Sequence, residues 1–301
     1  MRLVFAMAVL CVTMSADQTT AQGPPRPTFS AGYELHPHSR LADPEIGPAT
    51  EFLKTAEIRV GTLTLGATYP MVFGQGRTVL TNELSYHRFD LDYQGFPETV
   101  TFIESLHSID YTARIARTLS DRWRLMGVVK PGVASDLEGG IGQDDLVFQV
   151  VAIFVRVYSQ RFQVGYGIAW ANTFGQPFPL PVLSANWNDG GRVRVSTILP
   201  ASLEVWYAAS PRTELGLQCN ISGNRYHLDP DIHGVTNPLL KYSVITMGPS
   251  FNRRFADGIV VRIHGGLSLQ RRFELADGDE ELVDYGLESA GFARVQVEVA
   301  H

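Results

Sequence analysis

Charged side chains recur at alternate positions along several segments of this 301-residue sequence. Alternate residues of a β-strand point to the same side, so these charges would share one face of each strand. Fixed charges on one face either form ion pairs or line a water-filled passage. The side chains predicted to share these faces are Arg114, Arg122, Arg124, Lys130, Arg192, Arg194, Glu204, Glu214, Arg262, Arg294 and Glu298.

Two interpretations of these charged faces stay open. In the structural one, arginines and glutamates pair and fill a narrow interior with side chains. In the functional one, arginine is in excess and attracts anions, although the chain carries a net charge of −6. The acidic residues would then gather in loops such as 277–284. If the interior is open, the sequence predicts a preference for small anionic solutes.

A second group of residues has types that bind metal ions. His227, Asp229 and Asp231 alternate, which could gather one imidazole and two carboxylates around a cation. Pro230 interrupts regular geometry, and no glycine-punctuated metal loop surrounds these residues. We therefore expect a solvated loop here, without a metal ion or other cofactor.

A third possibility is hydrolytic chemistry, which needs a serine, a histidine and a polar orienting group on neighbouring strands. His264 and Ser268 share a face of one segment, and His87 lies on another. The sequence contains no Gly-x-Ser-x-Gly motif, no phosphate-binding loop and no zinc-type Cys/His spacing. Basic blocks typical of nucleic-acid binding are also missing. We therefore expect that the protein is not an enzyme. The alternative is a lipid-modifying or lipid-hydrolysing enzyme embedded in the barrel.

The elements that position these side chains are two-faced strands. In 292–299, Phe292, Arg294, Gln296 and Glu298 alternate with an aliphatic residue at every other position. The segments 161–171, 213–221 and 259–270 show the same pattern. Strands are expected near 53–66, 77–90, 104–118, 121–133, 145–158, 161–173, 180–187, 191–199, 201–209, 212–222, 239–252, 257–270 and 286–300, with a weak one at 29–35.

The connections between these segments alternate in length. Tight turns alternate with longer polar stretches, which we predict to be loops at 36–50, 134–144, 174–180, 223–238 and 271–285. The junction Leu199-Pro200-Ala201 is short where this scheme requires a long loop. Short turns on one rim and long loops on the other are typical of outer-membrane barrels. The residues expected in an aromatic girdle at the strand ends are Trp123, Tyr158, Phe162, Trp170, Phe174, Trp187 and Trp206.

The composition permits membrane residence without a membrane helix. The hydrophobic fraction is 45%, and no apolar run reaches the about 18 residues that a membrane helix needs. Residues 1–21 read as a cleaved signal peptide, 22–50 as a Pro-rich segment with the weak strand, and 51–301 as a barrel. Cys219 would then be the mature chain's single cysteine, on the apolar face of its strand.

We therefore predict an all-β fold, an antiparallel transmembrane up-and-down β-barrel of about 12–14 strands in the outer membrane. Outer-membrane lipid and the barrel-assembly machinery would be its partners. Its expected role is a passive pore, a small-solute channel or a structural barrel. A secreted soluble β-sandwich that binds a ligand also remains open, because its strands alternate in the same way.

One stretch has a familiar pattern: Pro179-Leu180-Pro181, Trp187-Asn188-Asp189, Leu203-Glu204-Val205-Trp206-Tyr207 and Gly223-Asn224-Arg225-Tyr226. It resembles an uncharacterised family of bacterial outer-membrane barrels, domain of unknown function 6268, and the segment from Leu80 fits its early region. The resemblance covers 50–301. It implies a barrel and an outer-membrane location, and it brings no catalytic residues.

Overall fold

The computed structural model describes residues 26–42, 50–97, 103–138, 140–172, 179–228, 235–255, 258–278 and 280–300. One short 3₁₀ helix, η2 (Glu51–Lys54), accompanies a large sheet. In the described part of the chain, no helix is long and apolar enough to cross a membrane. The strands are β1 (Thr28–Ala42), β2 (Glu57–Phe73), β3 (Thr78–Gln94), β4 (Ser105–Ser120), β5 (Trp123–Ser135), β6 (Leu146–Ser159), β7 (Phe162–Ala171), β8 (Leu180–Asn188), β9 (Val193–Leu199), β10 (Ser202–Ser210), β11 (Thr213–His227), β12 (Pro238–Arg254), β13 (Ile259–Asp277), β14 (Glu280–Leu287) and β15 (Ala290–Ala300).

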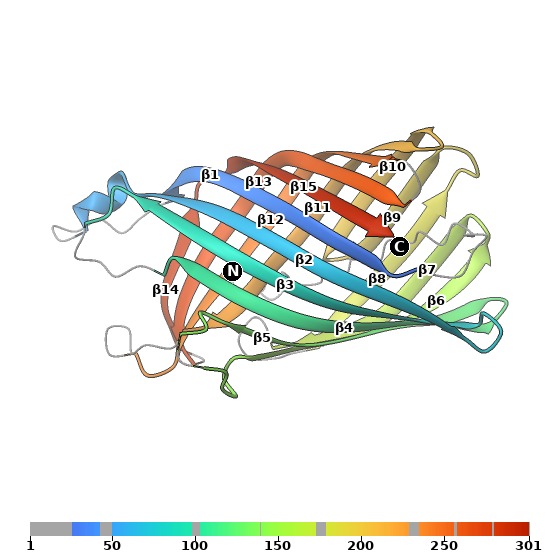
Figure 1. The fold of residues 1–301 in the computed structure, drawn as a ribbon, viewed down its shortest axis with the longest axis horizontal. Coiled ribbons are helices and arrows are strands. Elements are labelled where there is room, and N and C mark those ends of the chain that lie inside the picture. Colours follow the sequence, from blue (N-terminus) through green and yellow to red (C-terminus); the bar gives the residue numbers. More distant parts are fainter. Residues whose placement is uncertain are drawn as a thin grey trace.

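The sheet closes on itself into an antiparallel barrel (Figure 1). Strands β14 and β15 both pair with β13 on one side and with β1 on the other, so they are two parts of one wall strand. The 15 strand segments of the sheet therefore form 14 wall strands. This closure confirms the predicted barrel and contradicts a β-sandwich, which needs two separate sheets.

The barrel has one rim of tight turns and one rim of longer connections. The turn rim, at the right of Figure 1, carries the end of β15 and joins β2 to β3, β4 to β5 and β6 to β7. The loop rim lies at the left with η2 and β14. By the rule for bacterial barrels, the turn rim faces the periplasm and the loop rim faces outward.

Strands extend well into three of the segments that we expected to be loops. Residues 36–42 extend β1, 223–227 extend β11, 271–277 form the end of β13, and 280–285 form most of β14. All three lie toward the loop rim. The prolines of 36–50 and the polar residues of the other two made them look like loops, although their backbones pair in register with neighbouring strands.

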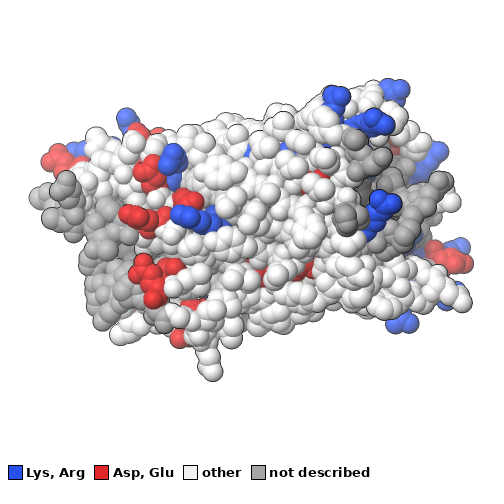
Figure 2. Space-filling view, in the orientation of Figure 1, with Lys and Arg blue, Asp and Glu red and all other residues white. Residues whose placement is uncertain are grey.

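The outer surface near the turn rim is apolar, as lipid requires. Lipid-facing leucines and valines from many strands are exposed there, including Leu65, Leu84, Leu217, Leu267 and Val297. The central part of the surface in Figure 2 correspondingly shows few charged side chains.

The predicted girdle is correct for most of the aromatic residues and wrong for one. Trp123, Tyr158, Phe162, Trp170 and Trp187 are exposed large side chains on this surface. Phe174 lies outside the described residues.

Trp206 is the exception, because it is 4% exposed and points into the barrel. Its Nε1 donates a hydrogen bond to Glu204 Oε2 at 2.9 Å. The ring packs on Gly216 of β11, where an added Cβ would lie 2.5 Å from Trp206 Cε3. Strand alternation points Trp206 inward, and the missing side chain at Gly216 makes room for its ring.

Along single strands, the polarity of the two faces inverts. In the part of β3 near the turn rim, Glu83 and His87 point inward and Leu84 outward. Nearer the loop rim, Phe89 is buried inside the barrel, while Arg88 and Asp90 pair on the outside. A strand that leaves the membrane meets water on its outer face, so its apolar side chains must turn inward.

The same inversion occurs in the neighbouring wall strands. We call the part with a polar inner face the membrane zone, and the loop-rim ends of β1–β5 and β11–β14 the cap. Inward apolar residues of the cap are Leu41, Ile58, Val60, Phe89, Leu91, Leu106, Ala134, Tyr226, Leu240, Tyr242, Val244, Phe273 and Leu287, which form one buried cluster.

Strands β8, β9 and β10 take no part in the cap. They have 9, 7 and 9 residues, against 17 in β12. The short junction at Pro200-Ala201 joins β9 to β10, consistent with a low rim at this point. Beyond it, the end of β11 reaches the end of β5, where His227 and Ser135 pair in parallel. This bridge lets the cap close without the short strands.

Candidate functional site: the barrel interior

Ion pairs line the inner face of the membrane zone. The Arg294 guanidinium contacts Glu34 Oε2 through Nε and Nη2. His36 Nε2 lies 2.8 Å from the other oxygen, Glu34 Oε1. The side chain of Glu34 is 11% exposed and that of Arg294 is 37% exposed, so the arginine faces the lumen.

Three further arginines face carboxylates from neighbouring strands. Arg114 pairs with Glu83 and Arg262 with Glu298. Arg194 Nη2 lies 3.7 Å from Glu214 Oε2.

A lysine, a histidine and an aspartate meet on β3, β4 and β5. Lys130 Nζ lies 3.1 Å from Asp110 Oδ2, and His87 Nε2 lies 3.7 Å from the same oxygen. Thr64 Oγ1 and His87 Nδ1 are 3.1 Å apart. Only glycine fits at position 132, because an added Cβ would lie 2.2 Å from Asp110 Oδ1.

The remaining candidates from the sequence divide into two groups. Arg124 Nη1 donates to Gln163 Oε1 at 3.4 Å, and Glu204 accepts the bond from Trp206. The predicted inward position is wrong for Arg122 and Arg192, because both lie in turns at the turn rim and are exposed. A tight turn takes its residues out of the strand alternation, so the inward assignment does not reach them.

Sequence reasoning missed three inward carboxylates: Glu34, Glu83 and Asp110. Glu83 alternates with Ser85 and His87, so the pattern could have revealed it. Glu34 lies in β1, which the sequence marked only weakly.

One part of the interior is apolar. Val151, Ile153 and Val155 of β6 are buried, and they form a cluster with Val182 of β8 and Ile198 of β9. The lumen of the membrane zone therefore combines ion pairs with an aliphatic cluster on β6, β8 and β9.

An aromatic cluster fills the centre of the cap. The Phe89 ring centroid lies 4.8 Å from that of Tyr242, 5.9 Å from Tyr226 and 6.3 Å from Phe273. Phe89 is 3% exposed and Phe273 is 7% exposed. These rings come from four strands and meet inside the cap, so side chains fill the centre of its interior.

A buried arginine lies close to this cluster. Arg271 is 1% exposed, and its Nη1 donates to Ser39 Oγ. Its Nε and Nη2 have no hydrogen-bond partner among the described residues. Such a guanidinium bears an uncompensated cost of burial.

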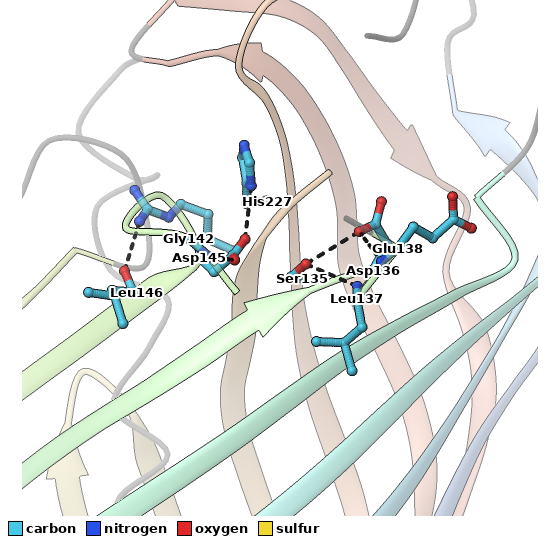
Figure 3. Close-up of polar contacts among 9 residues, drawn as sticks. Ser135, Asp136, Leu137, Glu138, Gly142, Asp145, Leu146 and His227 are labelled. Carbon is cyan, nitrogen blue, oxygen red and sulfur yellow. Dashed lines mark hydrogen bonds and ion pairs between the residues drawn. The ribbon is translucent and has the colours of Figure 1, made fainter. Parts of the chain in front are cut away.

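Figure 3 shows the polar contacts that hold the bridge between β5 and β11. His227 Nδ1 lies 2.8 Å from Asp145 Oδ1, and the Gly142 N–H donates to Asp145 Oδ2 at 2.6 Å. Arg225 Nη2 donates to the Leu146 carbonyl at 3.2 Å.

The metal-binding hypothesis depended on the neighbours of His227. Asp229 and Asp231 lie outside the described residues. Across the described ranges, no group of three His, Cys, Asp or Glu side chains could hold a metal ion.

The hydrolase hypothesis depended on His264 and Ser268. Neither ring nitrogen of His264 has a hydrogen-bond partner in the described chain. Ser268 Oγ donates to the Ala290 carbonyl at 3.0 Å. His264 does not activate this serine in the observed geometry.

The closed sheet, the apolar outer surface and the ionic interior define a transmembrane β-barrel of the outer-membrane type. The chain belongs to the family described as Domain of unknown function (DUF6268), whose model matches residues 74–281. No curated protein matches it.

Several solved structures are similar to this chain at low sequence identity. One is the COG4313 outer membrane channel from Pseudomonas putida F1, at 10% identity and a TM-score of 0.49, covering 93% of this chain and 97% of that one. Another is the P. putida toluene transporter TodX, at 8% identity and a TM-score of 0.40, covering 93% and 91%. The translocator domain of the autotransporter NalP from Neisseria meningitidis matches at 13% identity and a TM-score of 0.38, covering 91% and 87%.

Proposed function

We propose that this protein is a small-solute channel of the outer membrane, closed by its cap in the observed conformation. The observation that carries the proposal is the solvent accessibility of the ion-paired arginines inside the membrane zone. The inward side chains of Arg114, Arg194, Arg262 and Arg294 are 23%, 30%, 30% and 37% exposed. A barrel with a purely structural role would have no need of solvent around its inner ion pairs.

The proposed channel discriminates weakly between anions and cations. The anion preference expected from the sequence required an excess of inward arginine. In the structure, Glu34, Glu83 and Glu298 pair with inward arginines. These carboxylates balance most of the positive charge of the lumen. Arg124, which faces an amide rather than a carboxylate, is the remaining contribution toward an anionic solute.

Conduction through planar bilayers and swelling of proteoliposomes in a small sugar test the proposal. The double variant Phe89→Ala/Tyr242→Ala removes two rings from the cap and should increase both conductance and swelling rate. Phe154→Ala is the matched control, because Phe154 faces lipid and is 52% exposed. If native protein and cap variant both behave like protein-free vesicles, the barrel has a structural role instead.

We also propose that the chain reaches the outer membrane after removal of residues 1–21 and that the barrel-assembly machinery inserts it. Fractionation should recover a shortened chain in the outer membrane, with migration on gels that changes on boiling. Recovery of the unshortened chain, or of protein in the soluble periplasm, would contradict this route.

A further inference from the structure

Exposed arginines without carboxylate partners encircle the turn rim. None of them forms an ion pair with a described residue, whereas the inward arginines of the membrane zone do. The turn-rim arginines are Arg26, Arg77, Arg117, Arg122, Arg156, Arg161, Arg192, Arg212, Arg253 and Arg254.

The described acidic residues at this rim do not neutralise these arginines. Asp189 Oδ1 accepts backbone hydrogen bonds from Gly191 at 2.7 Å and Val193 at 3.1 Å. These backbone N–H groups lower the pKa of Asp189 and hold its carboxylate in its own turn. Asp121 is exposed in the turn between β4 and β5 and makes no ion pair with a described residue.

The loop rim shows the opposite arrangement, with exposed arginines paired within the chain. Arg88 Nε lies 2.8 Å from Asp90 Oδ1, and Arg59 Nη2 lies 3.0 Å from Asp92 Oδ2. In Figure 2, red and blue atoms intermix at the left end, whereas blue predominates at the right end. The turn rim therefore carries positive charge that described residues of the chain do not balance.

Aromatic contacts place several of these arginines at the depth of lipid headgroups. The Arg156 guanidinium lies 5.0 Å from the ring centroid of Tyr158 and 5.8 Å from that of Trp123. Arg192 Nη1 donates to the Tyr207 hydroxyl at 3.1 Å. Exposed tyrosine and tryptophan rings mark the membrane–water interface, where the phosphates of phospholipids lie.

We infer that the turn-rim arginines form a collar that binds the phosphates of anionic phospholipids in the periplasmic leaflet. The planar guanidinium donates paired hydrogen bonds to phosphate oxygens, and the net charge of an anionic lipid supplies the missing counter-charge. This role is independent of whether the lumen conducts solutes.

Native mass spectrometry of the detergent-solubilised protein, titrated with phosphatidylglycerol or phosphatidylcholine of equal chain length, tests the collar. The native protein should bind phosphatidylglycerol about ten-fold or more tightly, and added salt should weaken this preference. The variant Arg156→Gln/Arg192→Gln/Arg253→Gln should lose most of it. These exposed positions leave the wall intact, which heat-modifiable gel migration verifies.

The matched control is Arg40→Gln/Arg59→Gln/Arg88→Gln at the loop rim, which removes the same charge from paired sites and should keep the preference. Equal binding of both lipids by native protein would overturn the collar. Equal loss of the phosphatidylglycerol preference in both triple variants would also overturn the collar, because it would show a general effect of protein charge. Tighter binding of soluble polyglutamate than of phosphatidylglycerol would assign the collar to a periplasmic polyanion instead.

Discussion

The membrane zone and the cap are built from the same strands with opposite polarity. In the membrane zone, Glu83 points inward and Leu84 outward; in the cap, Phe89 points inward and Arg88 outward. Lipid surrounds the first region and water surrounds the second, so the apolar residues exchange faces where the strands leave the bilayer. The inversion therefore marks the outer boundary of the membrane on each strand that enters the cap.

The two regions also differ in what stabilises them. The cap buries aromatic and aliphatic side chains in a dry interior, as a soluble β-domain does. The membrane zone places most of its apolar residues in lipid, pairs its charges inside and keeps one buried aliphatic cluster on β6, β8 and β9. Substitutions of the same type should thus have different effects in the two regions.

The largest effect is expected in the centre of the cap. Phe89→Ala should lower the free energy of unfolding by about 3–5 kcal/mol, because the ring is buried and its loss leaves a cavity. Urea unfolding of protein in lipid vesicles measures it. Phe154→Ala, on the lipid face, should lower the free energy of unfolding by less. Equal decreases for the two variants would contradict a packed cap.

A charge on the lipid face comes next. Leu217 is 62% exposed on the outside of β11, so Leu217→Arg should destabilise the barrel by about 2–4 kcal/mol. Gln218 points into the lumen, so Gln218→Arg should lower the free energy of unfolding much less. If the two substitutions have the same cost in urea unfolding, the assignment of the two faces is wrong.

A smaller effect, of opposite sign, is expected at Arg271. Arg271→Met removes a buried guanidinium with two unpaired nitrogens and should stabilise the protein by about 1–3 kcal/mol. Arg294→Met should instead destabilise it, because the buried Glu34 loses its arginine partner and keeps only His36. A loss of stability in Arg271→Met would indicate that this side chain has a counter-charge.

The smallest effect is expected on the outside of the cap. Arg88 and Asp90 form an exposed pair, so Arg88→Gln should change the free energy of unfolding by about 0.5 kcal/mol or less. A larger loss in urea unfolding would mean that the outer face of the cap is covered.

Sequence alone predicts the membrane zone well and the cap poorly. Alternation in 213–221 and 259–270 gave strands, faces and the closed barrel, since lipid imposes a strict two-residue period. In 271–285 the outward residues are charged, and this polarity led us to expect a loop. The inverted alternation at Phe89 and Leu91 was visible, yet its meaning depends on knowing where the bilayer ends.

The interior could be predicted only in part. The inward positions of Arg114, Arg262 and Arg294 follow from strand period, but their partners come from other strands. Glu34 pairs with Arg294 because β1 closes the barrel against β15, a contact between the two ends of the chain. The contact between the ends of β11 and β5 has no local sequence signal either. It forms because the strands β8, β9 and β10, which lie between β5 and β11 in the sheet, are short.

The central claim is that the interior is wet in the membrane zone and dry in the cap. In a Cys219→Ser background, single cysteines at Gln296, Val295 and Val244 sample the lumen, the lipid face and the cap interior. The rate of modification by a charged, water-soluble methanethiosulfonate reagent reports access of water to each. We predict fast reaction at Gln296→Cys and slow reaction at Val295→Cys and Val244→Cys. Reaction at Val244→Cys as fast as at Gln296→Cys, or no reaction at Gln296→Cys, would contradict the account.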